Sequence, residues 1–185
     1  MINRIKLRIE IFADIICPWC YIGKKRLEKA LQDRPRIEVE LTWRGFLLNP
    51  SIPQSGIDRK QYLLSKFGHA ASSVYSRIEQ AGKQTGINFN FDAIKRTPDS
   101  RSIHELIIAT DFNGYQLSEL FYKAYFIDGK DISDKNIQND ILTAFDAKLH
   151  PTQEKIMDAK ETLKSDLIEA KEIGIDGVPF FIFNS

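Results

Sequence analysis

The chain has 185 residues, of which 43% are hydrophobic and 28% are charged, and its formal net charge is +1. This size and composition suit one large domain, or a small domain that carries an insertion. The balanced charge gives no electrostatic reason to expect nucleic acid as a partner. No apolar run approaches the roughly 20 residues that span a bilayer, and residues 1–10 alternate apolar and charged side chains, unlike a secretory signal. We therefore expect a cytoplasmic protein that does not enter a membrane.

Residues 5–48 predict a strand, a helix and a second strand. Residues 5–14 (IKLRIEIFAD) alternate apolar and charged side chains, which indicates a strand with one buried face. Residues 21–35 have helical spacing and end at a proline, so a helix is expected whose basic face, with Lys24 and Arg26, is solvated. Residues 37–48 alternate again, with Trp43 on the buried face. This order is that of a βαβ unit.

The middle of the chain is predicted to be helical. The expected helices cover residues 58–67, 71–85, 98–111, 115–126, 135–145 and 153–173. Asp58 is a candidate N-cap, and Gly174 suits the end of the last helix. Residues 177–184 (GVPFFIFN) return to strand character. We expect an α/β fold with a βαβ half in residues 1–50, a helical insertion in residues 51–150, and a return to the first domain in residues 151–185.

The two cysteines of the chain, Cys17 and Cys20, form a CPWC motif between the first strand and the helix. Pro18 suits the first turn of a helix, where its missing N–H loses no hydrogen bond. Free N–H groups and the positive end of the helix dipole favour a thiolate at Cys17, and the thiolate is the nucleophile. We expect the Cys20 sulfur, one turn later, to be more covered. The motif predicts a redox pair in which Cys17 attacks and Cys20 resolves, with Trp19 offering an apolar surface to a partner.

Other interpretations of the cysteines are less favoured. A disulfide across two intervening residues closes a minimal loop and would stabilise the fold little. A zinc site needs two further ligands, and His69, His104 and His150 have no ligand-like spacing. We expect no metal bound within one chain. A site shared across a dimer, or two inert buried cysteines, stays open.

Two further residues, Asp14 and His104, allow two interpretations each, and a third feature has an ordinary structural interpretation by itself. Asp14, just before the motif, either forms a local turn at the end of the strand or relays protons to Cys20. His104, at the edge of an apolar helix face, is either a satisfied core residue or lines a groove beside the cysteines. Proline in the pair Val178–Pro179 is ordinary at the start of a strand, because that position needs no ladder donor.

Taken together, CPWC after the first strand and GVPFF after the helical block resemble the thioredoxin-like superfamily. More specifically, the chain is similar to the DsbA family, in the branch related to FrnE-type oxidoreductases. The similar segments are DIICPWCYIG, FLLNP, SRSIHELIIA, LFYKAYFIDGKDISD and AKEIGIDGVPFFIF. The resemblance implies a thioredoxin-like fold with a large all-helical insertion. Because FrnE-like chains continue after the last strand, we expect a further strand and helix to be missing from this chain.

The resemblance also implies a protein disulfide oxidoreductase, with Cys17 as nucleophile and Cys20 as resolving cysteine. Pro179 would be a cis-proline facing the disulfide, and the backbone of Val178 would pair with an extended substrate. The dipeptide between the cysteines would tune the redox potential. The implied partners are thiols or disulfides of proteins or small molecules, with glutathione as one candidate. No organic cofactor is required.

Two other functions stay open. The fold is also similar to that of glutathione-dependent isomerases, such as 2-hydroxychromene-2-carboxylate isomerase, and of kappa-class glutathione transferases. Those relatives typically have serine at the position of Cys17. The third alternative is a non-catalytic module that binds a metal or client proteins through the surface around Trp19 and Val178.

Overall fold

The structure is a computed structural model and describes residues 5–146, 148 and 150–184. Its elements are β1 (Ile5–Ala13), α1 (Pro18–Gln32), β2 (Ile37–Gly45), β3 (Ile57–Asp58), α2 (Arg59–Phe67), α3 (Ala71–Gln84), β4 (Arg96–Thr97), α4 (Arg101–Ala109), α5 (Gly114–Phe126), α6 (Lys135–Phe145), α7 (Gln153–Glu172) and β5 (Phe180–Asn184). The predicted βαβ unit, the six later helices and the last strand are confirmed. The short antiparallel pair of β3 and β4, whose strands are separated in sequence by α2 and α3, was not predicted from the sequence.

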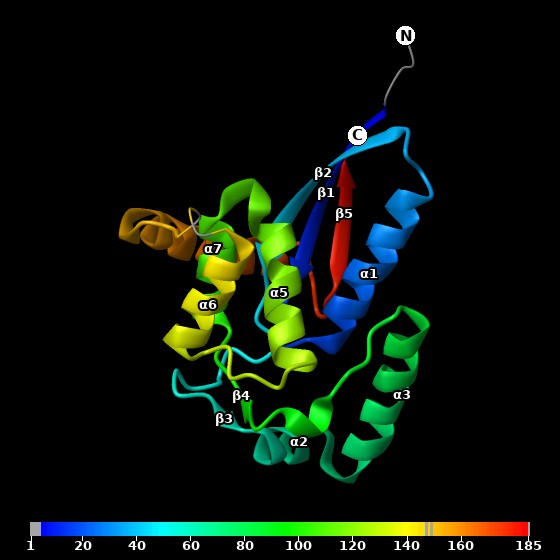
Figure 1. Ribbon diagram of the computed structural model, residues 1–185, viewed down its shortest axis with the longest axis vertical. Coiled ribbons are helices and arrows are strands. Elements are labelled where there is room, and N and C mark those ends of the chain that lie inside the picture. The colour runs from blue at the N-terminus through cyan, green and yellow to red at the C-terminus, as the bar shows by residue number, and fades with distance from the viewer. Residues whose placement is uncertain (1–4, 147, 149, 185) are drawn as a thin grey trace.

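The main sheet has the strand order β2-β1-β5. β1 is parallel to β2 and antiparallel to β5, with Ile9 opposite Leu41 on one side and Phe183 on the other. The parallel pair is joined by α1, which is the crossover that a parallel connection requires. Figure 1 shows that α1 and β5 begin at the same end of the sheet, the end that faces α2 and the pair of strands β3 and β4. Part of the inserted segment, including α2, therefore lies at the end of the sheet where the CPWC motif begins α1.

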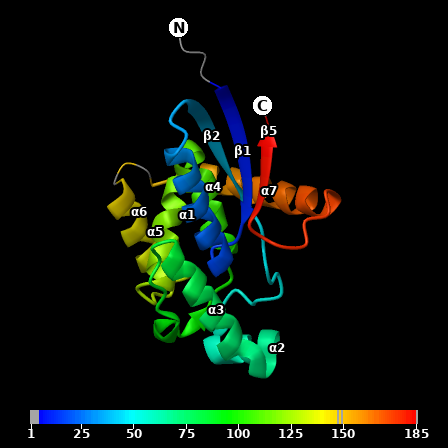
Figure 2. The ribbon, with the colours of Figure 1, turned by 90° about the vertical axis from the view of Figure 1, so that its right-hand side faces the viewer.

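The second half of β1 is buried on both faces. Ile9 and Ile11 belong to the main core, which they share with α1 and the inserted helices. Phe12 points to the opposite face and packs with Ala170 of α7 and with Ile175. The prediction of a single buried face is therefore wrong for this half, because α7 runs across the strands and covers the other side (Figure 2).

Helix ends follow the expected residues. The side chain of Asp58 caps α2 by accepting a hydrogen bond from the backbone N–H of Gln61. Thr152 caps α7 in the same way. Gly174 follows α7 with φ of 77°, a left-handed conformation that glycine adopts without steric cost. Local capping chemistry therefore sets these boundaries.

The basic face of α1 is not solvated throughout. Lys24 is 4% exposed, donates a hydrogen bond to the carbonyl of Tyr115 at 2.8 Å and pairs with Glu28 at 2.9 Å. Its ammonium lies 3.3 Å from the centroid of the Tyr115 ring, and burial lowers its pKa. The expectation of a solvated face is wrong for Lys24 because α5 packs on it, whereas Arg26 is exposed.

Candidate active site

The CPWC motif forms the N-terminus of α1. Cys17 is the N-cap residue, with extended backbone angles, and Pro18 is the first helical residue. The backbone N–H of Cys17 donates to the carbonyl of Asp14 at 3.0 Å, while the Cys17 carbonyl accepts from the N–H of Cys20 at 3.1 Å. The structure thus places both cysteines where the sequence predicts them, at the positive end of the helix dipole.

The two cysteine residues are similarly buried, and their sulfurs have different surroundings. Cys17 is 3% exposed and Cys20 is 2% exposed, and both are free thiols. As whole residues, both cysteines are therefore almost fully buried. Sγ of Cys17 lies 3.7 Å from the carbonyl oxygen of Val178. Burial, and then the neighbouring Cys17 sulfur, raise the pKa of the Cys20 thiol well above its ordinary value, so Cys20 is a thiol at neutral pH.

The loop before β5 brings Val178 and Pro179 against the motif. The bond between them is cis. Pro179 packs on α1 at Gly23, where an added Cβ would lie 2.7 Å from Cγ of the proline ring. The candidate nucleophile Cys17 therefore lies between its own helix and the loop that contains Val178 and Pro179, which is distant in sequence.

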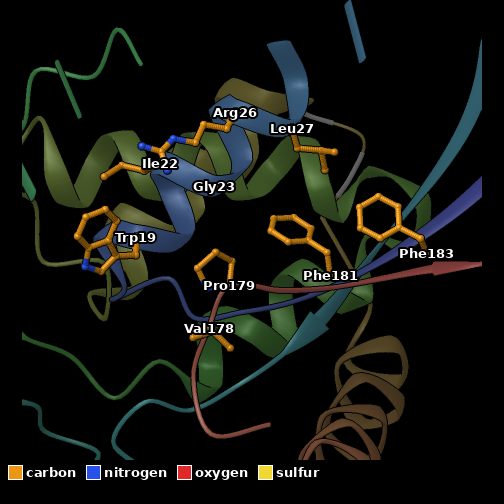
Figure 3. Close-up of a pocket in the computed structure, with 9 residues that line it drawn as sticks. All are labelled: Trp19, Ile22, Gly23, Arg26, Leu27, Val178, Pro179, Phe181 and Phe183. Atoms are coloured by element: carbon orange, nitrogen blue, oxygen red, sulfur yellow. The ribbon is translucent and has the colours of Figure 1, made fainter. Parts of the chain in front are cut away.

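An apolar groove of about 520 Å³ runs from this site along α1 and β5 (Figure 3). Its lining residues are Trp19, Ile22, Gly23, Arg26, Leu27, Val178, Pro179, Phe181 and Phe183. Trp19 is 41% exposed, and Phe183 at the other end is 59% exposed. Sequence reasoning found the Trp19 and Val178 surfaces but missed Phe181 and Phe183. Their alternate positions in FFIF, which share one face of a strand, were the available signal.

Asp14 is fully buried and its carboxylate has three hydrogen-bond partners. Oδ1 accepts from the backbone N–H of Ile16 at 3.2 Å, and Oδ2 accepts from the N–H of Leu48 at 2.8 Å. Nε2 of His104 lies 3.3 Å from Oδ1. The charge of this carboxylate is one of the smaller causes that raise the pKa of Cys20, after burial. Asp14 thus forms the predicted local turn and also lies within electrostatic reach of Cys20.

His104 is also fully buried, so it does not line the groove. The indole Nε1 of Trp43 donates to its Nδ1 at 3.3 Å. On another side of the site, the hydroxyl of Tyr122 donates to the main-chain carbonyl of Asp14 at 3.3 Å. The sequence indicated that Trp43 is a core residue, and it is, but no local pattern links it to a histidine on α4.

The described residues gather no three His, Cys, Asp or Glu side chains that could hold a metal ion. His104 is engaged with Trp43 and Asp14, and the exposed His150 contacts the hydroxyl of Thr143 at 3.1 Å. No helix in the described part of the chain is both long and apolar enough to cross a bilayer.

A match to a known family accompanies this geometry. The profile of the DSBA-like thioredoxin domain matches residues 8–185, nearly the whole chain. The chain belongs to the DsbA-like thioredoxin domain family. The resemblance to the DsbA family, stated from CPWC and GVPFF, is confirmed, as is the thioredoxin-like fold with inserted helices.

Solved structures in this DsbA-like family and fold are similar over most of the chain. A Streptomyces coelicolor protein described as a "probable DsbA oxidoreductase" has 25% identity and a TM-score of 0.79, covering 96% of this chain and 80% of its own. The cytosolic disulfide reductase DsbM of Pseudomonas aeruginosa, solved with GSH, has 15% identity and a TM-score of 0.63, covering 94% and 84%. A 2-hydroxychromene-2-carboxylate isomerase has 13% identity and a TM-score of 0.65, covering 95% and 84%. The last two likenesses show the fold alone.

A curated relative is the uncharacterized protein YwbO of Bacillus subtilis. It is 25% identical over 138 residues, which are 71% of this chain and 62% of YwbO. The match thus spans about three fifths of that relative's length.

Proposed function

We propose that this DsbA-like protein is a thiol–disulfide oxidoreductase that cycles Cys17 and Cys20 between dithiol and disulfide. The observation that carries the proposal is the placement of the Cys17 sulfur at a helix N-cap, 3.7 Å from the carbonyl of Val178. Cys20 follows on the first turn of the same helix. Membership of the DsbA-like family supports this class of reaction.

In the reducing direction, the Cys17 thiolate attacks one sulfur of a substrate disulfide. The substrate S–S bond breaks, a Cys17–substrate disulfide forms, and the other substrate sulfur leaves as a thiolate that takes a proton from water. The Cys20 sulfur then attacks Cys17, which releases the remaining substrate thiolate and closes the Cys17–Cys20 disulfide. Because burial keeps Cys20 protonated, this second step needs a proton acceptor, and Asp14 is the proposed one.

The site supports a substrate that is extended and partly apolar. Its backbone would pair with Val178 by strand addition, and its side chains would contact Trp19 and the groove. No metal or organic cofactor enters the reaction, since both electrons pass between sulfur atoms. Two molecules of glutathione, oxidised to glutathione disulfide, would restore the dithiol. The DsbM structure solved with GSH supports glutathione as the redox partner in a cytoplasmic protein.

Trapping the intermediate tests the proposal. Cys20→Ser treated with glutathione disulfide should accumulate one glutathione on Cys17, detected by intact mass and by release with dithiothreitol. Cys17→Ser is the matched control and should carry no glutathione after the time in which Cys20→Ser is fully modified. If the protein forms no adduct but isomerises 2-hydroxychromene-2-carboxylate in the presence of glutathione, it is a glutathione-dependent isomerase and the proposal is wrong. Client binding that survives replacement of both cysteines by serine would replace it with a binding module.

A further inference from the structure

Arg59, the first residue of α2, is a buried arginine that pairs with no Asp or Glu in the described part of the chain. It is 4% exposed, and its hydrogen-bond acceptors are neutral oxygens. One terminal nitrogen donates to the hydroxyls of Thr97 at 3.1 Å and Tyr125 at 3.3 Å, and the other donates to the hydroxyl of Tyr75 at 2.6 Å. Its buried Nε has no hydrogen-bond partner among the described residues. Arg44, in contrast, contacts three carboxylates.

Three tyrosine rings surround the Arg59 guanidinium. Its Cζ lies 5.7 Å from the ring centroid of Tyr62, 5.3 Å from that of Tyr75 and 5.9 Å from that of Tyr125. Aromatic faces attract a cation but carry no net charge, and burial raises the pKa of Tyr75 and of Tyr125, so both stay neutral. Arginine keeps its proton in proteins. Because a buried charge is costly unless it is paired, this cluster has a net positive charge that an anion would balance.

The cluster approaches solvent at Tyr75. The contacts of Arg59 with Thr97 and Tyr125 are buried, whereas its contact with Tyr75 is only part-buried. Because the Tyr75 oxygen accepts from Arg59, its O–H group is available to donate to a ligand. A carboxylate matches this pair, since its oxygens only accept and it carries the charge that a guanidinium binds most strongly.

Tyr75 is also close to the reactive cysteine. Its helix, α3, packs against α1, and Ile78 of α3 belongs to the same core cluster as Cys17. Burial raises the pKa of Tyr75 most, and the charge of Cys17 adds to this rise, so the hydroxyl lies within electrostatic reach of the sulfur. The N-terminus of α1 faces α2, which Arg59 begins (Figure 1). In glutathione the glycine carboxylate follows the cysteine by one residue, about 3.5 Å of extended chain, so it stays near a sulfur that reacts with Cys17.

We propose that Arg59 and Tyr75 form a subsite that binds a carboxylate of the substrate while the substrate sulfur reacts with Cys17. This subsite rests on the proposed function and gives it a substrate class, small peptide thiols and disulfides with a carboxylate near the sulfur. When the Cys17 thiolate attacks glutathione disulfide, the bond between the two glutathione sulfurs breaks. One glutathione forms a disulfide with Cys17, and the other leaves as a thiolate that takes a proton from water.

The rate at which Cys17 forms a mixed disulfide in Cys20→Ser tests the subsite. Glutathione disulfide carries carboxylates, whereas 2-hydroxyethyl disulfide has none. Arg59→Met should slow the reaction with glutathione disulfide about tenfold, the effect of one lost charge-assisted contact, and change the reaction with 2-hydroxyethyl disulfide about twofold or less. Tyr75→Phe, which removes only a hydroxyl, should slow the first reaction about threefold. Lys60→Met, which removes the exposed positive charge next in sequence, is the matched control and should leave both rates within about twofold.

Esterified glutathione disulfide measures the contact itself. With Arg59 present, Cys20→Ser should react about tenfold more slowly with glutathione disulfide whose carboxylates are ethyl esters than with the parent disulfide. With Arg59→Met added, the ester should cause a loss of about twofold or less, because both changes remove the same interaction. Losses that multiply in full would overturn the assignment of Arg59 to the carboxylate.

Two results in Arg59→Met would overturn the subsite. Equal slowing with both disulfides would show that Arg59 acts on the Cys17 thiolate or on the fold, and an unchanged rate with glutathione disulfide would show that it does not bind the substrate. If Cys20→Ser forms no adduct with either disulfide, the proposed function is wrong. Adducts with both disulfides, but no preference that depends on Arg59, would overturn the subsite alone.

Discussion

Gly23 of α1 lies so close to Pro179 that the helix has no room for a methyl group between them: a Cβ at Gly23 would be 2.7 Å from Cγ of the proline. Glycine inside a helix costs about 1 kcal/mol relative to alanine, so its place here reflects the close approach of the loop. That approach accompanies the 3.7 Å contact between the Val178 carbonyl and the Cys17 sulfur.

Gly23→Ala should therefore impair the site although it favours the helix. The added methyl must displace Pro179, and overpacking of this kind costs about 1–3 kcal/mol. We expect disulfide reduction to slow about tenfold or more, measured with glutathione disulfide, while circular dichroism shows an intact fold. Gly177→Ala is the matched control, because it lies in the same loop with nothing within 4 Å of its added Cβ. A Gly23→Ala protein as active as Gly177→Ala would contradict this account.

The Cys20 thiol should ionise only at alkaline pH. Its pKa is raised by burial first and then by Cys17, so in Cys17→Ser most of the shift should persist. The rate of alkylation of Cys20 should start to rise only above the ordinary cysteine pKa of about 8.5. Mass spectrometry at stepped pH measures this rate, and the urea-unfolded variant provides the ordinary midpoint.

The raised pKa of Cys20 also predicts how the free energy of unfolding changes with pH. Above the ordinary cysteine pKa the unfolded chain loses the proton that folded Cys20 keeps, so the free energy of unfolding of Cys17→Ser should fall as pH rises through that range. A folded-state midpoint at or below that of the unfolded chain would show that burial does not control this thiol.

Arg44 should be a large contributor to stability. Its guanidinium contacts Glu10, Asp166 and Glu169, joining the sheet to α7, and it packs on the ring of Phe12. Arg44→Met leaves the buried Asp166 carboxylate without its cation, which should cost about 3 kcal/mol in urea unfolding. Glu169→Gln removes a 44% exposed partner and should cost about 1 kcal/mol or less. If the two variants lose the same free energy of unfolding, the ion pair of Arg44 with buried Asp166 is not the main contribution of this side chain.

Trp19 should affect substrate binding more than the chemistry of Cys17. Its exposed indole forms one end of the groove, next to Val178 and Pro179. Trp19→Ala should raise KM for an apolar peptide disulfide about tenfold, as loss of an aromatic anchor does. Iodoacetamide alkylation of Cys17 should change by about twofold or less, since a small reagent does not need the groove. If the alkylation rate changes as much as KM, Trp19 affects the reactivity of the Cys17 thiol rather than substrate binding.

The sequence predicted the elements whose patterns are long and local. Residues 5–14 and 37–48 alternate regularly, and the helices after Asp58 have clear periods and caps, so these elements were found. β3 and β4 are two residues each and carry no period to read. The burial of Lys24 depends on α5 packing against α1, which no local pattern reports.

The residues of the candidate site also fall into those that the sequence predicted and those that it did not. Cys17, Cys20 and Pro179 were identified because their motifs are short and specific. The contact between Trp43 and His104 joins residues that are 61 positions apart, and it exists only because α4 packs on β2. The sequence therefore left two interpretations of His104 open, a core residue or a residue lining the groove. In the structure its ring is buried and each ring nitrogen has a polar partner.

The central claim is that Cys17 and Cys20 exchange two electrons as a pair, and a redox equilibrium tests it most directly. The purified protein would be equilibrated in glutathione buffers of stepped potential, quenched in acid, and its free thiols counted by alkylation and mass. The account predicts one reversible transition in which both thiols disappear together, and no such transition in Cys17→Ser. Failure of Cys17 and Cys20 to form a disulfide at any potential would contradict it.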